Sequence, residues 1–330
     1  MLRWSGPAAL IAALLLLRLF GDRWWPALPL LYGPRWPLGV LTLTPLLALH
    51  RKAGRGTLAA MFTAVVAFGL VMDFRVPWRN VIPSGNSATH PMRILAWNVQ
   101  GGGPDVAATL HEIQRQSPDV TIISECASGI AQALERAVGE ALHRSSDLCL
   151  LTTLPVVEWA PRDPRDFWEM AGSGAIARLV VMVAGTEVVV GGVHLETPRG
   201  ALEALAKRAF FSFPGAAADN QAARDLESEV ARHWIAPVGE VRPVVVAGDF
   251  NLVSESAIFQ RWWGDLDNAF SRHGFGVGWT KQTRLFGVRI DHVLSGNGAR
   301  VDRVAVGALM GADHRPLIVD LQIPVGLSEQ

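Results

Sequence analysis

The chain of 330 residues contains little cysteine and no excess of charge of either sign. Only Cys126 and Cys149 occur, too few for a disulfide scaffold, and they could either pair in an oxidising compartment or remain buried thiols. Lys plus Arg and Asp plus Glu each number 30. The composition therefore lacks the basic character typical of a nucleic-acid binder, although balanced charge does not exclude that partner.

Several enzyme motifs are also missing. The sequence has no cysteine–histidine spacing of a zinc site, no serine nucleophile elbow, no Walker phosphate-binding loop and no internal repeat. Covalent catalysis by a serine and P-loop chemistry are thereby disfavoured. Carboxylates, amides and histidines remain as the candidate functional groups.

Long apolar runs, in contrast, are abundant near the N-terminus. Half of the residues are hydrophobic and the mean hydropathy is +0.24. The apolar runs Ala8–Leu17, Pro37–Leu49 and Leu58–Met72 have tryptophans near their ends, as interfacial segments do. They predict a membrane region over residues 1–79 with about three transmembrane helices, of which the second is short for a bilayer core of about 30 Å.

Basic residues predict the orientation of this region. The short loop Arg51–Arg55 is strongly positive and belongs in the cytoplasm by the positive-inside rule. Three spans then place the N-terminus inside and everything after Phe74 outside. We therefore expect a multi-pass protein of a bacterial inner or plasma membrane with an extracytoplasmic domain. Residues 80–91 are expected to be a linker, 92–324 the catalytic domain and 325–330 a tail.

The region after residue 92 alternates between strand-like and helix-like segments, which is typical of a layered α/β domain with mixed sheets. The run VVVAGDFNLV at Val244–Val253 predicts a core strand that ends in an acid and an amide. Polar residues recur at predicted strand ends, and together they predict a convergent active site. These residues are Asn98, Glu125, His194, Asp249, Asn251, Asp291, Asp313 and His314.

Oxygen-bearing side chains suit a hard cation, Mg²⁺ first and Mn²⁺ or Ca²⁺ next. Histidine beside acids suits proton transfer and contact with phosphate. A metal, an acid and a histidine without a nucleophilic side chain indicate that water attacks a phosphate ester.

The motifs ILAWNVQ, IISECA, GGVHLE, VVVAGDFN, RIDHVLSG and ADHRPLIVDL occur in that order. They resemble the successive motifs of the endonuclease/exonuclease/phosphatase superfamily, over Met92 to about Gln322. The resemblance implies the deoxyribonuclease-I-like fold, in which two mixed sheets pack face to face with helices outside. The combination with N-terminal helices resembles membrane-anchored bacterial members.

The resemblance also implies a role for each matching residue. Asn98 and Glu125 match metal-binding positions, and Asp313 matches a further acid near the metal. Asp249 matches the acid that activates water, and Asn251 the amide that holds the phosphate. His314 matches the histidine on the scissile phosphate, Asp291 its partner, and His194 a group that stabilises the phosphate or leaving oxygen. His292 is expected to be structural.

Some residues depart from the family pattern or leave the substrate open. Ser124 replaces the glutamine that many relatives carry before the metal-binding glutamate, and Thr197–Ala218 is rich in phenylalanine. Gly278–Leu285, with Lys281, lies where relatives shape the substrate pocket. The substrate could be DNA or RNA, a phospholipid as for a sphingomyelinase, or a small phosphoester. The non-enzymatic alternative is a pseudoenzyme that serves as a membrane scaffold, and no protein partner is implied.

Overall fold

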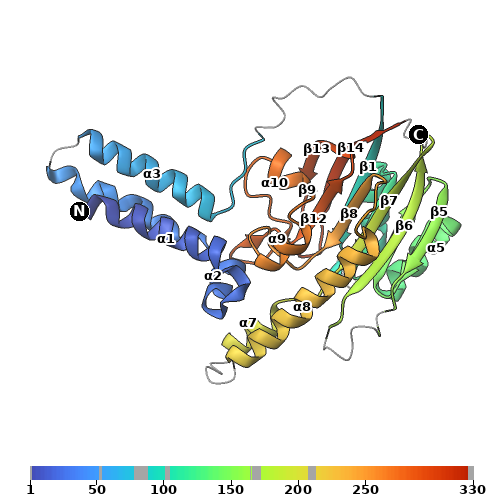
Figure 1. Cartoon of the computed structure of the whole chain (residues 1–330), viewed down its shortest axis with the longest axis horizontal. Helices are drawn as coiled ribbons and strands as arrows, with labels where there is room; N and C mark the ends of the chain where they lie inside the picture. Colours follow the sequence, from blue (N-terminus) through green and yellow to red (C-terminus); the bar gives the residue numbers. More distant parts are fainter. Residues whose placement is uncertain are drawn as a thin grey trace.

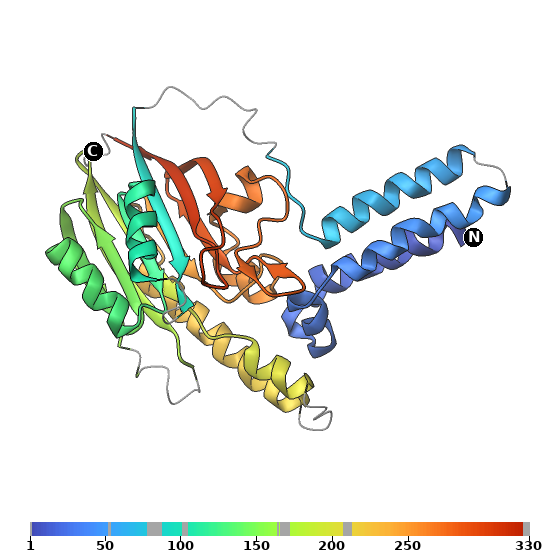
Figure 2. The same ribbon diagram turned by 180° about the vertical axis from the view of Figure 1, so that it is seen from behind.

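A computed structural model describes residues 2–51, 54–77, 88–100, 105–163, 165, 172–206 and 213–325. After residue 88, two six-stranded sheets pack face to face with helices outside (Figures 1 and 2). The first sheet has the order β13 (Arg300–Val306), β14 (Leu317–Pro324), β1 (Thr89–Asn98), β2 (Val120–Ser124), β4 (Leu148–Thr152) and β3 (Leu142–Ser145). The second has the order β5 (Val156–Pro161), β6 (Ala175–Val183), β7 (Thr186–His194), β8 (Val244–Asp249), β12 (Asp291–Gly296) and β9 (Asp267–Asn268).

Both sheets are mixed, because β1 is parallel to β2 and β7 is parallel to β8 while the other pairs are antiparallel. A short ribbon of β10 (Lys281–Gln282) and β11 (Gly287–Val288) stands apart. The helices are α4 (Val106–Gln116), α5 (Ser128–Val138), α7 (Arg199–Ala206), α8 (Phe213–Ile235), α9 (Ala257–Trp263) and α10 (Ala269–His273). The predicted α/β sandwich of two mixed sheets is confirmed.

The apolar run in β8 is continuous because both of its faces are buried. Val245 and Ala247 point into the core between the sheets, and Val244 and Val246 point the other way, where the core includes Ile235 of α8. Gly248 interrupts the run at a φ of +135°, and a Cβ there would lie 2.0 Å from the Val193 carbonyl oxygen. Only glycine fits this close approach, and it delivers Asp249 to the sheet edge.

The two cysteines form a disulfide, which settles the question that composition left open. Cys126 follows the end of β2 by two residues and Cys149 lies in β4, next to β2 in the sheet. The bond therefore fastens the segment that carries Glu125 to the neighbouring strand.

Residues 2–77, which we call the helical arm, extend away from the sandwich (Figures 1 and 2). The arm consists of η1 (Leu2–Trp4), α1 (Ser5–Leu19), η2 (Gly21–Arg23), η3 (Trp25–Ala27), α2 (Leu28–Tyr32), η4 (Trp36–Arg51) and α3 (Arg55–Val71).

The arm differs from the three transmembrane helices that were predicted. The α-helices α1 and α3 have 15 and 17 residues. At about 1.5 Å per residue both are shorter than a bilayer core of about 30 Å. The middle run is a 3-10 helix that contains Pro45. Across the described ranges, no helix combines the length and the apolarity that crossing a membrane requires.

Parts of several predicted segments lie outside the described residues: 52–53 of the positive loop, 78–79 of the membrane region, most of the linker 80–91, most of the tail 325–330, and 207–212 of the phenylalanine-rich segment. The remainder of that last segment includes α7 and the start of α8.

Candidate active site

The sheet registers bring several strand ends together. Asp249, the last residue of β8, pairs with His194 at the end of β7 and with Asp291 at the start of β12. In the other sheet, Asn98 ends β1 beside the last residue of β2, after which Glu125 follows. Because the two sheets pack face to face, these residues lie at one shared edge of the sandwich.

Asp249 lies at the centre of this edge and is only 2% exposed. Its Oδ1 accepts a hydrogen bond from the main-chain N–H of Asn251 at 2.9 Å, and its Oδ2 accepts one from Asn98 Nδ2 at 2.9 Å. The same Oδ2 lies 3.7 Å from His314 Nε2 and 3.9 Å from His194 Nε2. One carboxylate is thus flanked by two imidazoles and held by two N–H donors.

On one side of Asp249, His314 is deeply buried and closely held. Its Nδ1 lies 2.8 Å from Asp291 Oδ2, so the expected pair is in contact. Its Nε2 lies 2.9 Å from Lys281 Nζ, on the β10–β11 ribbon, and this lysine also forms an ion pair of 3.0 Å with Asp313. A hydrogen bond of 3.0 Å from the Asp291 N–H to Thr280 Oγ1 further fixes the acid.

On the other side, His194 has an aspartate of its own. His194 Nδ1 lies 2.7 Å from Oδ2 of Asp147, a residue in the turn between β3 and β4. Both side chains are partly exposed, 19% for His194 and 38% for Asp147. Two His–Asp pairs therefore place their Nε2 atoms within 4 Å of the same carboxylate oxygen.

Two of the predicted site residues lie on backbone in the left-handed region. Glu125 has a φ of +53° and Asn251 a φ of +50°. Asn98 Nδ2 donates to Glu125 Oε1 at 3.1 Å, which joins the two residues expected to bind metal. Asn251 Nδ2 donates to the Leu195 carbonyl oxygen at 2.8 Å, which fixes the orientation of its amide.

Burial and charge shift the pKa of each central group. Burial, reinforced by the charge of Asp291, raises the pKa of Asp249. Burial alone would lower the pKa of His194, but its hydrogen bond to Asp147 and the charges of Asp249 and Asp147 raise it to about 9. The pKa of His314 is likewise raised: burial opposes this, and so does the charge of Lys281, but the charges of Asp291 and Asp249 prevail.

The donor set fits a divalent cation. Asp249, Asp291 and His314 offer ligand atoms that lie within 4.8 Å of one another. Asp291 Oδ1 and Asp313 Oδ1 are buried and have no hydrogen-bond partner among the described residues. Crowded carboxylate oxygens with unused lone pairs are the chemistry that Mg²⁺ prefers.

The predicted residues divide into two groups around this centre. Asn98 and Glu125 lie together, whereas Asp313, the third expected ligand, contacts Lys281 and is 3.7 Å from His314 Nε2. His292 lies away from the site, with its ring nitrogens 3.0 Å from Asn268 Nδ2 and 2.8 Å from the Leu252 carbonyl oxygen. The assignment of individual ligands therefore stays a prediction.

Sequence reasoning missed Asp147 and noted Lys281 only as a neighbour of the substrate pocket. Neither residue follows a predicted core strand, which was the signal used for the others. For Asp147, a turn acid two residues before Cys149 in a tight hairpin was the available signal.

The fold and this site define a hydrolase built on a two-sheet α/β sandwich. Its centre of acids, amides and histidines suits phosphate esters. The chain belongs to the Endonuclease/Exonuclease/phosphatase family, whose model matches residues 95–314. Enzymes of this family hydrolyse phosphate ester bonds with the help of divalent metal ions, so the predicted enzyme class is confirmed.

Among solved structures, the chain is similar to TDP2 from D. rerio in complex with a single-strand DNA product. The two share 17% identity over 70% of this chain and 98% of that one, with a TM-score of 0.56. It is also similar to a family protein from Bacteroides thetaiotaomicron, with 12% identity over 74% and 99% of the two chains and a TM-score of 0.53. No curated protein matches it by sequence. At these identities the likeness shows the fold.

Proposed function

We propose that this protein is a membrane-anchored, divalent-metal-dependent phosphodiesterase in which Asp249 activates the attacking water. The observation that carries the proposal is the placement of Asp249, a buried carboxylate flanked by two imidazoles at 3.7 and 3.9 Å. A carboxylate with a raised pKa in a dry setting is a stronger base than one in water.

In this proposal each neighbour has a distinct task. Asp249 takes a proton from water, and the Nε2 atoms of His314 and His194 donate hydrogen bonds to the phosphate oxygens. Asn251 holds the phosphate through its fixed amide. Asn98, Glu125 and Asp313 would hold Mg²⁺, with Mn²⁺ or Ca²⁺ as alternatives, and the ion would neutralise charge that develops on the phosphate.

Hydrolysis of bis-p-nitrophenyl phosphate tests this function. We expect activity with Mg²⁺ or Mn²⁺, loss of activity in EDTA, and recovery when the metal is returned. Asp249→Asn should lower kcat by about 10²- to 10⁴-fold with little effect on folding, whereas Glu125→Gln should raise the metal concentration required. Full activity after thorough chelation contradicts the mechanism, and a folded chain inactive on all phosphoesters supports the scaffold alternative.

The membrane anchor is supported by the surface of the helical arm. Many of its large apolar side chains are more than a third exposed, an unusual density for a surface in water. They include Ile11, Leu15, Leu43, Leu58, Phe62 and Val65. We expect the arm to bury this surface in a bilayer, so that the full chain floats with liposomes. Recovery of the full chain in the unbound fraction contradicts the anchor.

An extracytoplasmic site is supported by the Cys126–Cys149 disulfide, because such bonds persist in oxidising compartments. The positive loop Arg51–Arg55 supports the same orientation. A C-terminal phosphatase reporter should be active, and a fluorescent reporter that requires the cytoplasm should be dark. The reverse pattern places the domain in the cytoplasm.

A lipid headgroup is the substrate class that the arm favours, because an anchored enzyme meets lipid at high effective concentration. Nucleic acid is the second candidate, since TDP2 of similar fold has been crystallised with a DNA product. A panel of phospholipid vesicles, sphingomyelin vesicles, single-stranded DNA and phosphomonoesters distinguishes these substrates by kcat/KM.

A further inference from the structure

The loop that follows Asp249 is tied to the helical arm. This loop, Phe250–Ser256, connects catalytic strand β8 to helix α9 and is called the active-site loop below. The last three residues of the loop, Ser254 to Ser256, and the first residue of α9, Ala257, each bond to an arm side chain. The bonds join Ser254 Oγ to Asp73 at 3.2 Å, Glu255 Oε1 to Arg35 at 2.6 Å, Ser256 Oγ to Asp22 at 2.5 Å and Ala257 N to Asp22 at 2.8 Å.

Arg35 connects the arm to the active-site loop through a buried ion pair. Its guanidinium donates to the carbonyl oxygens of Leu30, Leu31 and Val71 at 2.8–2.9 Å, and so it is fixed to the arm on one side. On the other side it donates to Glu255, which is 4% exposed. Arg35 of the arm and Glu255 of the loop thus form one buried ion pair. Removal of either partner leaves the charge of the other buried and uncompensated.

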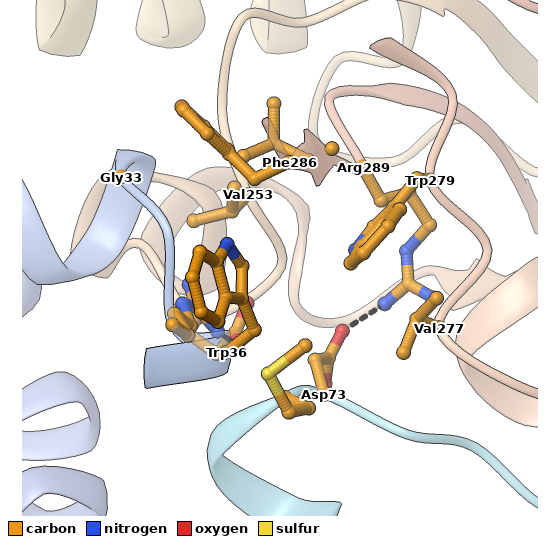
Figure 3. Close-up of a pocket in the computed structure, with 13 residues that line it drawn as sticks. Gly33, Trp36, Asp73, Val253, Val277, Trp279, Phe286 and Arg289 are labelled. Carbon is orange, nitrogen blue, oxygen red and sulfur yellow. Dashed lines mark hydrogen bonds and ion pairs between the residues drawn. The ribbon is translucent and has the colours of Figure 1, made fainter. Parts of the chain in front are cut away.

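The surroundings of this ion pair are closely packed. Trp36 of the arm faces Trp279 of the sandwich, and beneath them Asp73 pairs with Arg289 (Figure 3). A cavity of about 30 Å³ between them is lined by residues of both the arm and the sandwich. The hydrogen bonds of Ser254, Glu255 and Ser256 place the arm in direct contact with the active-site loop.

A second connection leads from the arm to Asn251. The hydroxyl of Tyr32 accepts a hydrogen bond from Arg224 Nη2, which also donates to the Asn251 carbonyl oxygen at 3.2 Å. The Arg224 guanidinium lies 5.1 Å from the centre of the Tyr32 ring and is 1% exposed. Asn251 has a φ of +50°, in the left-handed region, and the bond from Arg224 holds the carbonyl of this residue in place.

We propose that the helical arm positions the catalytic machinery, through Asp22, Tyr32 and Arg35 acting on the active-site loop. These are positioning residues, because Asp22 and Arg35 bond to the far end of the loop and Tyr32 reaches Asn251 through Arg224. The proposal rests on the proposed phosphodiesterase function. It differs from simple anchoring, because it requires the arm for hydrolysis of a small soluble diester that needs no membrane.

The test uses the full chain in detergent with Mg²⁺ and bis-p-nitrophenyl phosphate. Arg35→Met and Tyr32→Phe are compared with Arg23→Met, which makes the same type of change at an exposed arginine of the arm. We expect kcat to fall about 10- to 100-fold in Arg35→Met, the range associated with misplacement of catalytic groups by about 1 Å. Tyr32→Phe should lose less, Arg35→Lys should recover part of the rate, and Arg23→Met should match the parent protein.

Hydrogen exchange of the loop amides gives a second readout that does not depend on turnover. Exchange over residues 250–257 should accelerate in Arg35→Met and Tyr32→Phe but not in Arg23→Met. If Arg35→Met fails to fold, the double variant Arg35→Met/Glu255→Gln is used in its place, because it removes both charges of the buried ion pair. Unchanged kcat and unchanged exchange overturn the proposal. A parent protein that hydrolyses no phosphoester contradicts the proposed function instead, and exchange then still tests the connection between arm and loop.

Discussion

The two sides of Asp249 carry the same pair of residue types in different surroundings. On one side, the side chains of His314 and Asp291 are each 1% exposed. On the other, His194 and Asp147 are 19% and 38% exposed, and Asp147 comes from a turn of the other sheet. Water screens the second pair, so its charges act more weakly on a bound phosphate than those of the first.

The two histidines are therefore similar in their distance from Asp249 but differ in the strength of their electrostatic contacts. The distances from Asp249 to the two imidazoles, 3.7 Å for His314 and 3.9 Å for His194, differ by only 0.2 Å. Distance alone therefore does not rank the two histidines. Burial does, because an electrostatic contact in a dry site is stronger than the same contact near solvent. Removal of His314 should therefore cost more than removal of His194.

The largest effect is expected for His314. His314→Ala should lower kcat/KM about 10³-fold, within the range for a group that transfers or shares a proton. Asp291→Ala should also be severe, and the double variant should be little worse than His314→Ala alone, because the two act as a unit. Steady-state kinetics of the full cycle measure this, and strictly additive losses show that the two residues act separately.

A smaller loss is expected on the exposed side. His194→Ala should lower kcat/KM about 10²-fold, and Asp147→Asn about tenfold, because asparagine can still orient the ring but no longer stabilises its charge. Asp163→Asn, at an exposed acid paired with Arg165, is a matched control and should be neutral. Equal losses for His194→Ala and His314→Ala remove the distinction between the two sides.

The last prediction concerns the stability of the fold and not the rate, and involves His292, which follows Asp291 in β12. Burial lowers the pKa of His292 to about 3, so the folded protein keeps it neutral. The unfolded chain takes up a proton below about pH 6.5. The contribution of neutral His292 to the free energy of unfolding is therefore complete above that pH. It is lost as pH falls toward 3, by at most about 1.4 kcal/mol per pH unit. Urea unfolding should show a shallower acid loss in His292→Gln, and an unchanged slope contradicts the assignment.

Strand ends were the part of this site that local sequence could reveal. The run before Asp249 and the polar residues at other strand ends predicted an edge where Asn98, Glu125, His194 and Asp291 meet. The first three lie at the ends of parallel neighbours, which end together, and Asp291 joins them because antiparallel β12 starts where β8 ends. Asp147 escaped because its position depends on how β3, β4 and β2 align, and this register is set by pairings distant in sequence. Lys281 depends in the same way on the bridge that sets the β10 ribbon against His314.

The arm shows a second limit. Apolar runs predicted where its helices lie, but not that α1 and α3 stop at 15 and 17 residues or that the arm sits on the active-site loop. Asp22 and Arg35 were the available signal, because charged residues in an apolar region require a buried partner. Their partners, Ser256 and Glu255, are more than 200 positions away in sequence, and no local pattern identifies them.

The left-handed backbone of Glu125 and Asn251 has a cost in the stability of the fold. Each conformation costs a non-glycine residue about 1 kcal/mol relative to glycine, and less for asparagine. Selection for heat resistance alone would therefore favour glycine at both positions and erase an expected metal ligand and a phosphate contact in doing so. The side chains predicted to bind metal and phosphate therefore lie on backbone that glycine would adopt at lower cost, a local trade of stability against function.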